Sequence, residues 1–112
     1  MSTEPVKIEI DGQGLRYAEG KPRYNLIPPE PMEELAHHFR RGMEKYAERN
    51  WERGMSWGHC FRAAMSHLWK FWRGEELDEE TGTHHVICAA WNCFALYTYV
   101  VRGIGEDSRM KL

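Results

Sequence analysis

Apolar residues recur at helical spacing in three stretches of this chain. In the first, apolar side chains around Leu35 and Phe39 follow one another at intervals of three and four, which places them on one helix face. The second stretch carries two apolar stripes, and the third is apolar on almost every side. The pattern predicts helices over residues 31–49, 57–73 and 83–102, of which the third should be the most buried.

Residues with known preferences for helix ends stand at the boundaries of these stretches. Proline is tolerated in a first helical turn, and asparagine or glycine suits the C-terminal end of a helix. Serine and threonine accept backbone N–H groups at a helix N-terminus. The residues assigned to these positions are Pro29 and Pro31, Asn50, Ser56, either Thr81 or Thr83, and Gly103.

The two ends of the chain lack a helical pattern. Val6, Ile8 and Ile10 alternate with polar residues, but no partner strand is evident, so residues 1–25 are interpreted as an extended arm. Residues 104–112 are expected to form a frayed tail. The predicted fold is therefore all-α, with three helices in one domain, which agrees with a length of 112 residues.

The aromatic content exceeds what so few helices can bury, with five Trp, five Tyr and four Phe. Large apolar patches on the surface of a folded chain usually mark interfaces. We therefore expect a homo-oligomer in which a second copy of the chain completes the helical bundle.

Charge and composition exclude several classes of function. The net charge of −2 provides no basic field for a nucleic-acid polymer, and no apolar run is long enough to span a membrane. The first residues lack the apolar core of a signal peptide, so a cytoplasmic location is expected. Cys60, Cys88 and Cys93 lack metal-binding spacing, so we expect reduced core thiols rather than zinc ligands.

An acidic hinge separates the second and third helices. Glu75 and Asp78 stand three residues apart, so both carboxylates can face one cation, and oxygen ligands suit Mg²⁺ or Mn²⁺. Glu80 is a candidate third ligand, or a group that orients a water molecule. The alternative is that these acids only complement the dipole of the following helix and stay solvated.

Histidines flank this hinge on both sides. His85 begins a polar stripe with Cys88 and Asn92 on the third helix, and His67 lies near the hinge on the second. Burying such groups costs about 1–3 kcal/mol each unless they find partners. They are either hydrogen-bonded core residues or parts of a site. For an enzyme, metal-assisted hydrolysis fits better than covalent catalysis, because no nucleophile stands beside a base.

Two further polar regions have alternative interpretations. Lys21, Arg23 and Tyr24 belong to a stretch rich in glycine and proline, which is either a mobile linker or a strap that binds phosphate and a base. The polar face of the first helix, which includes His38 and Arg41, is interpreted as solvated surface.

Three segments carry motifs in a characteristic order: GKPRYNLIPPEPMEELA, then GMEKYAERNW, then SHLWKFWRGEELDEETGTHHVICAAWN. They resemble a phage-associated family of dATP/dGTP diphosphohydrolases of the MazZ type, among the MazG-like all-α nucleoside triphosphate pyrophosphohydrolases. Positions that match the family motifs are Lys21, Arg23, Leu26, Pro28, Pro29, Lys45, Tyr46, Asn50, Trp51, His67, Glu75, Asp78, Glu80, Gly82 and His85. Asn25, Ala47 and Cys88 depart from the family pattern, which has Asp, Gly and His there.

The resemblance implies that residues 26–103 hydrolyse dGTP and dATP to the monophosphate and pyrophosphate, with Mg²⁺ or Mn²⁺ as cofactor. In some phages the dGMP serves diaminopurine DNA synthesis. It further implies a homodimer or homotetramer, in the host cytoplasm if the chain is phage-encoded. Residues assigned on this basis are Glu75, Asp78, Glu44 and Glu48 for the metal; His67, Glu80 and His85 for catalysis; and Lys21, Arg23, Tyr24, Lys45, Tyr46, Asn50 and Trp51 for the substrate.

Two alternatives stay open at this point. The acidic ExxE pair of the superfamily matches Glu30 and Glu33 in spacing, whereas Glu44 and Glu48 stand four residues apart and are slightly favoured. The second alternative is a non-enzymatic helical protein–protein interaction module, in which the aromatic surplus contacts a partner and the acidic hinge is a solvated loop.

Overall fold

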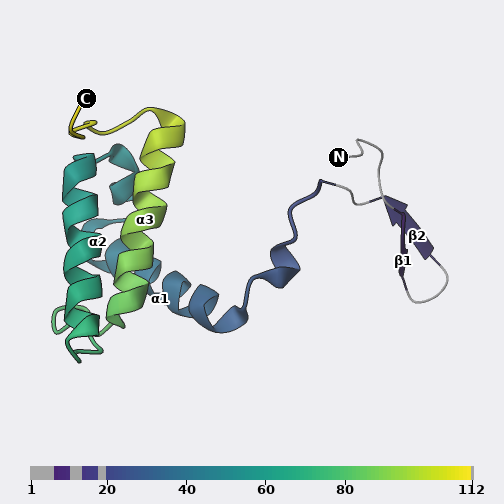
Figure 1. Ribbon diagram of the computed structural model, residues 1–112, viewed down its shortest axis with the longest axis horizontal. Coiled ribbons are helices and arrows are strands. Elements are labelled where there is room, and N and C mark those ends of the chain that lie inside the picture. Colours follow the sequence, from purple (N-terminus) through teal and green to yellow (C-terminus); the bar gives the residue numbers. More distant parts are fainter. Residues whose placement is uncertain (1–6, 11–13, 18–19, 112) are drawn as a thin grey trace.

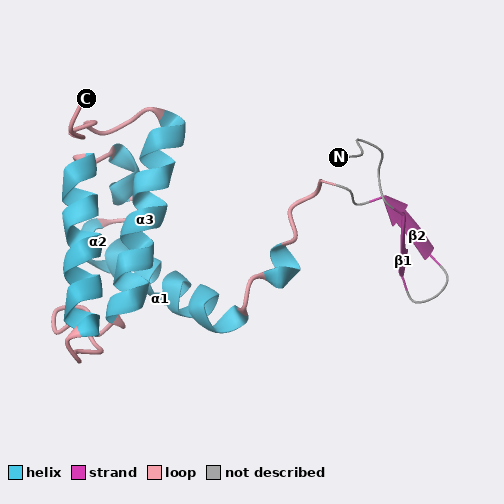
Figure 2. Ribbon diagram, viewed as in Figure 1, coloured by secondary structure: helices cyan, strands magenta, loops and turns pink. Residues whose placement is uncertain are grey.

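The computed structural model describes residues 7–10, 14–17 and 20–111. Within these residues it contains three α-helices and two short 3₁₀ helices: α1 (Pro29–Tyr46), α2 (Trp57–Trp72), α3 (His85–Arg102), η1 (Tyr24–Leu26) and η2 (Asn50–Arg53). α2 and α3 run antiparallel along each other, and α1 packs against α3 (Figure 1 and Figure 2). The predicted all-α fold is confirmed. No helix in this described part is long and apolar enough to cross a membrane.

The end of α1 differs from the prediction. The helix stops at Tyr46 because Ala47 adopts φ 103°, a conformation that an α-helix cannot continue. Asn50 begins η2 instead of capping α1. This early end frees residues 47–55 to form a loop that turns the chain back towards α2.

The N-terminal caps of α2 and α3 also differ from the predicted ones. Ser56 precedes α2 as predicted, but its hydroxyl lies 3.0 Å from that of Ser108 and caps no backbone N–H. His84, rather than either threonine, caps α3, because its Nδ1 accepts a hydrogen bond from the N–H of Val86 at 3.2 Å. Gly103 ends α3 with φ 65°, as predicted.

The first part of the predicted arm is a hairpin, so the expectation of no partner strand is wrong. β1 (Lys7–Ile10) pairs antiparallel with β2 (Gly14–Tyr17), with Ile8 opposite Arg16. Four residues are too few for β2 to show an apolar period in the sequence. In Figure 1 the hairpin lies apart from the helices. Parts of the predicted arm and the last residue of the tail lie outside the described residues.

The core is built around α3, which contributes more fully buried residues than the other described helices, as predicted. Cys60 on α2 packs there with Ala95 and Tyr99 on α3, and large aromatic side chains surround them. Cys60 and Cys88 are buried free thiols. Cys93 is exposed, so its predicted place in the core is wrong.

The C-terminal segment is packed, so the expectation of a frayed tail is wrong. The backbone N–H of Trp57 donates to the carbonyl oxygen of Glu106, and its indole N–H donates to that of Ile104, both at 2.9 Å. Gly105 has φ 77°, and a Cβ at this position would collide with the carbonyl oxygen of Met55. The tail therefore closes the end of the α2–α3 pair.

Alkaline destabilisation is expected from Tyr99. Its side chain is fully buried and its hydroxyl donates to the carbonyl oxygen of Trp51 at 2.6 Å. Burial, with a smaller contribution from Cys60, raises the pKa of Tyr99 to about 12. Because this is above the unfolded value of about 10, the stabilisation is complete below pH 10 and is lost as pH rises towards 12. We expect a loss of about 1.4 kcal/mol at pH 11.

The measurement is chemical denaturation between pH 8 and pH 11 of the wild type and Tyr99→Phe. The variant should be less stable at pH 8, because the carbonyl of Trp51 loses its donor, but should show a shallower alkaline decline. Tyr24→Phe, at a 76% exposed tyrosine, should keep the wild-type decline. Equal slopes for wild type and Tyr99→Phe would contradict this assignment.

Candidate functional site

An open cleft of about 1040 Å³ lies between the end of α1, the loop of residues 47–55, the hinge and α3. It brings together residues that are far apart in the sequence. The predicted site residues that line it are Lys45, Tyr46, Glu48, Asn50, Trp51, His67, Asp78 and Glu80. The tertiary structure thus gathers many of the candidates around one space.

The hinge comprises residues 73–84 between α2 and α3, and its own hydrogen bonds hold it in a turn. The N–H of Asp78 donates to the carbonyl oxygen of Thr83 at 2.8 Å, and the N–H of Gly82 donates to that of Asp78 at 2.7 Å. Oδ2 of Asp78 accepts hydrogen bonds from the N–H and the hydroxyl of Thr81, at 3.0 and 2.8 Å. Oδ1 accepts none within the described residues, so it is available to a ligand.

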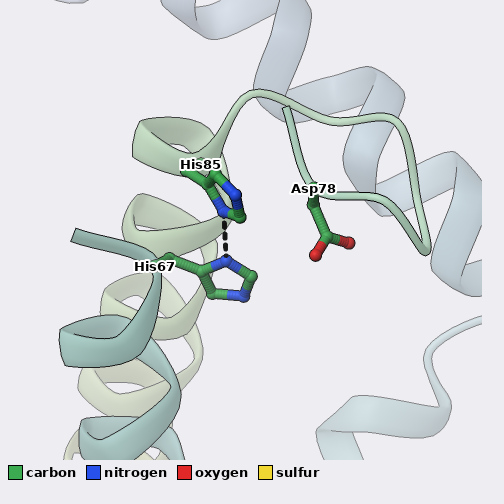
Figure 3. Close-up of side chains that lie close together, drawn as sticks. All are labelled: His67, Asp78 and His85. Carbon is green, nitrogen blue, oxygen red and sulfur yellow. Dashed lines mark hydrogen bonds between the residues drawn. The ribbon is translucent and has the colours of Figure 1, made fainter. Parts of the chain in front are cut away.

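A chain of three side chains connects the end of α2, the hinge and the start of α3. Nε2 of His85 lies 2.7 Å from Oε2 of Glu75. On the other side of the ring, Nδ1 of His85 lies 2.8 Å from Nδ1 of His67, the contact drawn as a dashed line in Figure 3. Because a carboxylate only accepts, Nε2 of His85 is the donor to Glu75. In a neutral imidazole the other nitrogen then accepts, so Nδ1 of His67 donates to His85. Nε2 of His67 keeps its lone pair.

The residues that can hold a metal ion lie where the two bonded histidines approach the hinge. His67, Asp78 and His85 each offer a ligand atom, and these atoms all lie within 4.8 Å of one another. Figure 3 shows the two imidazoles, from α2 and α3, with the carboxylate of the hinge beside them. Two imidazoles and one carboxylate are a donor set that divalent metals accept in proteins. The residues present therefore fit a metal ion.

A second polar contact joins α1 to the hinge, and sequence reasoning missed it. The hydroxyl of Thr83, only 1% exposed, lies 2.9 Å from Nδ1 of His38 and accepts a hydrogen bond from the guanidinium of Arg41. His38 and Arg41 are partly buried and line the cleft, so their assignment to solvated surface is wrong. Their spacing of three residues on the helix was the available signal, but it does not reveal a partner that lies 45 residues from His38 and 42 from Arg41.

Burial shapes the proton affinity of this site. Burial lowers the pKa of His67, and His85 and Lys70 add to this effect while Asp78 opposes it. Burial, Arg41 and His67 likewise lower the pKa of His38. Burial alone would raise the pKa of Asp78, but the hydrogen bonds from Thr81 and the nearby histidines outweigh it and lower the pKa. At neutral pH the site therefore presents an ionised Asp78 and the neutral imidazoles of His38 and His67.

Lys45 and Glu80 are paired across the cleft. Nζ of Lys45 lies 2.5 Å from Oε1 of Glu80 and 5.0 Å from the ring centre of Tyr46. The hydrogen bond to Glu80 is the main cause that raises the pKa of Lys45. Both partners are mostly exposed, so the pair can open to admit a ligand.

Trp51 is more deeply packed than a base-stacking residue needs to be. Its ring lies 5.6 Å from Phe39, 6.0 Å from Trp91 and 6.2 Å from Tyr99, between ring centres. It therefore forms a fixed wall of the cleft. Asn50 precedes it at the start of η2 and lines the same wall.

Several predicted site residues are not brought to the cleft. Lys21, Arg23 and Tyr24 precede α1 and are exposed, and Arg23 bonds to Asn25 at 3.2 Å. Glu44 is paired with Arg40 at 3.0 Å, and Glu30 and Glu33 lie on the exposed first turns of α1. Glu48 lines the cleft but does not belong to the three-residue metal cluster.

Comparisons with known proteins agree with the family resemblance. A family model described as "dATP/dGTP diphosphohydrolase, N-terminal" matches residues 11–109. The chain is also 32% identical over 77 residues to a protein of Salmonella phage PMBT28 named "dATP/dGTP diphosphohydrolase". That match covers 69% of this chain but only 26% of the relative's length. No solved structure gives a significant match. Because the family model covers most of its length, the chain belongs to the dATP/dGTP diphosphohydrolase N-terminal family.

Proposed function

We propose that this chain hydrolyses purine deoxynucleoside triphosphates, dGTP and dATP, to the monophosphate and pyrophosphate in the cleft. The name of the phage relative supports the substrate class. One observation carries the proposal. Cationic side chains from α1 and the following loop line the same cleft as a carboxylate from the hinge and imidazoles from α2. In a phage that builds diaminopurine DNA, the dGMP would feed that synthesis while dATP is removed.

The triphosphate would lie against the cationic wall. Arg41, Lys45 and Arg53 line the cleft, and Arg53 forms no ion pair within the described residues. Charge-assisted hydrogen bonds from guanidinium groups to phosphate oxygens are short and strong. They would hold the phosphates and stabilise the charge that develops on pyrophosphate as it leaves.

The reaction needs a water molecule whose oxygen attacks the α-phosphorus while the bond from that phosphorus to the α–β bridging oxygen breaks. Oδ1 of Asp78 and Nε2 of His67 have free lone pairs beside the cleft. Each can either accept the water proton directly or bind a metal ion that activates the water, and the lowered pKa of His67 keeps its imidazole unprotonated at neutral pH. A divalent metal bound beside Asp78 would offset phosphate charge and polarise the water.

The base would occupy the end of the cleft near residues 46–51. Tyr46 is 60% exposed and can stack on a purine, whereas the packed ring of Trp51 limits the depth of the cleft. The side-chain amide of Asn50 offers both a donor and an acceptor for the edge of the base.

The test is to incubate the chain with each of the four deoxynucleoside triphosphates and Mg²⁺ or Mn²⁺, and to separate the products by ion-exchange chromatography. Formation of dGMP or dAMP with an equal amount of pyrophosphate supports the proposal. Release of orthophosphate, or no turnover above that of a denatured control, overturns it.

The interaction-module alternative is favoured by one specific observation, the exposed apolar surface of α2 and α3. A thermal melt with dGTP and Mn²⁺ separates the two functions. A ligand that binds only the folded chain raises the melting temperature, and the increase grows with the ligand concentration. An unchanged melting temperature at millimolar ligand favours the module.

We also propose that a second copy of the chain covers this surface. α2 exposes Phe61, Met65, Leu68 and Trp72 along one stripe, and α3 exposes Val86, Phe94, Tyr97, Val100 and Val101. We call these nine residues the apolar face. No charged residue occurs between positions 86 and 101 of the sequence. A groove of about 460 Å³ is lined by Phe61 of α2 and Val100 of α3 together with Met110 of the C-terminal segment.

The size of the apolar face supports a homodimer. Nine large, roughly half-exposed side chains present on the order of 800 Å², which is what one partner buries in a stable interface. A face made by two antiparallel helices can pack on its own copy around a two-fold axis. Such a dimer would leave α1 and the cleft outside the four-helix centre.

A charge in the apolar face should dissociate this dimer. Tyr97 is 71% exposed in the single chain, and Tyr97→Glu would bury an unpaired carboxylate in the interface. We expect the dissociation constant to rise by roughly 100-fold or more, measured by sedimentation velocity. Ser66→Glu, on the polar side of α2, should leave it unchanged. A wild-type chain that is monomeric at 100 µM would contradict the proposal.

A further inference from the structure

We infer that His67, Asp78 and His85 form the metal site of the cleft, with Glu75 as an outer carboxylate. The site takes a first-row transition metal such as Mn²⁺, Co²⁺ or Zn²⁺ in preference to Mg²⁺. This inference rests on the proposed function for its purpose, because it names the cofactor class of the same site. Its test does not depend on turnover.

The three side chains come from three different elements and meet at one point. His67 lies on α2, Asp78 in the hinge and His85 at the first position of α3, and one atom of each lies within 4.8 Å of the others. His67 and Asp78 also line the cleft, so a bound ion would be in reach of a ligand there.

The donor set decides the class of metal. Mg²⁺ requires oxygen ligands in a near-ideal octahedron and keeps much of its water, whereas imidazole suits the later divalent metals of the first row. Carboxylates alone, which the sequence suggested, would favour Mg²⁺ or Mn²⁺. Two histidines in place of two carboxylates also lower the negative charge of the site, which weakens it for a hard cation.

Glu75 has the position of an outer carboxylate. Its Oε2 lies 2.7 Å from Nε2 of His85, on the side of the ring away from His67. In metal sites a histidine ligand usually donates its second N–H to such a carboxylate, which fixes the tautomer and directs the other nitrogen to the metal. Glu75 would therefore act through His85 as a positioning residue rather than as a ligand.

The site is held in place before any metal binds. His85 is 0% exposed and both its ring nitrogens have partners, while Thr81 fixes one oxygen of Asp78. The contact of 2.8 Å between two imidazole nitrogens is a bond that a metal shared by both rings would replace. The other predicted metal ligands lack this convergence, since Glu44 is paired with Arg40.

The experiment uses the full chain without an affinity tag, stripped with EDTA and free of nucleotide. Zn²⁺, Co²⁺, Mn²⁺ and Mg²⁺ are each titrated by calorimetry, and Co²⁺ also by visible absorption. We expect one Zn²⁺ or Co²⁺ per chain, with a dissociation constant at least ~100-fold below that of Mg²⁺. A Co²⁺ spectrum identical to that of the aqueous ion, or Mg²⁺ binding as tight as Zn²⁺, overturns the inference.

Variants distinguish ligands from the outer carboxylate. His67→Ala and Asp78→Asn should abolish the stoichiometric binding, whereas Glu75→Gln should weaken it by about 10–100-fold. His37→Ala, at an exposed histidine of α1, is the matched control and should bind as the wild type does. An unchanged Zn²⁺ affinity in a folded His67→Ala variant overturns the site. If that variant does not fold, the Co²⁺ spectrum of the wild type decides whether the site exists.

The two proposals fail in different ways. Tight transition-metal binding without dNTP hydrolysis removes the proposed function and leaves the metal site. Hydrolysis that is fully supported by Mg²⁺ and unaffected by His67→Ala removes the metal site and leaves the function.

Discussion

Asp78→Asn is expected to lower kcat/KM for dGTP by roughly 10²–10⁴-fold, the range for loss of a positioned proton acceptor or metal-activating group. Oδ2 of Asp78 holds Thr81, whereas Oδ1 is free and the lowered pKa keeps the group ionised. Asparagine retains an oxygen for Thr81 but loses the negative charge. The variant should therefore keep the conformation of the hinge and lose the hydrolytic activity. The measurement is the initial rate of pyrophosphate release.

The control for this prediction is Asp107→Asn. Asp107 is bonded to Arg109 in the C-terminal segment and does not line the cleft. The Asp107→Asn variant should hydrolyse dGTP at the wild-type rate. Circular dichroism should show both variants folded. If Asp78→Asn keeps its rate within threefold of wild type, Asp78 has no role in catalysis.

Trp91→Ala is expected to lower the free energy of unfolding by about 3 kcal/mol. Its ring on α3 lies about 6 Å from those of His38, Phe39 and Trp51, between ring centres. It is thus one of the contacts that hold α1 and the loop of residues 47–55 to α3. Because Trp91 lines the cleft, removing its ring leaves a void in the cleft wall between the surrounding rings. Denaturant titration with fluorescence and circular dichroism measures the loss.

Tyr24→Ala is the matched aromatic truncation at an exposed site. Its side chain is 76% exposed, so the stability change should stay within about 0.5 kcal/mol. Equal losses for the two variants would show that the aromatic cluster does not hold α1 in place.

Helical periodicity alone placed all three helices and identified α3 as the most buried. This worked because apolar spacing reports directly which side of a helix leaves water. The ends of the helices were less predictable. Ala47 adopts φ 103°, which alanine rarely does, and the cap of α3 is His84, which is not among the residues usually preferred at that position. β2 is too short to show an apolar period, and the C-terminal segment is held by contacts with Trp57 that are distant in the sequence.

The chemistry of the hinge was also visible in part. Glu75, Asp78, His67 and His85 were all singled out from their positions beside two helix ends. The sequence did not decide their roles. ExxD spacing shows which carboxylates can converge on one cation, but it does not show which side chains lie close together in the fold. The fold joins Asp78 to two histidines and turns Glu75 towards His85.

The sequence by itself determined the helices, the acidic hinge with its flanking histidines and the family, because each depends on residue types at short, fixed spacing. Only the tertiary structure decided which residues meet. It bonded His38 and Arg41 on α1 to the buried hydroxyl of Thr83, and it left Lys21 and Arg23 away from the cleft. The physical reason is that a cleft is made by packing between elements, and residues 40 or more positions apart share no local pattern.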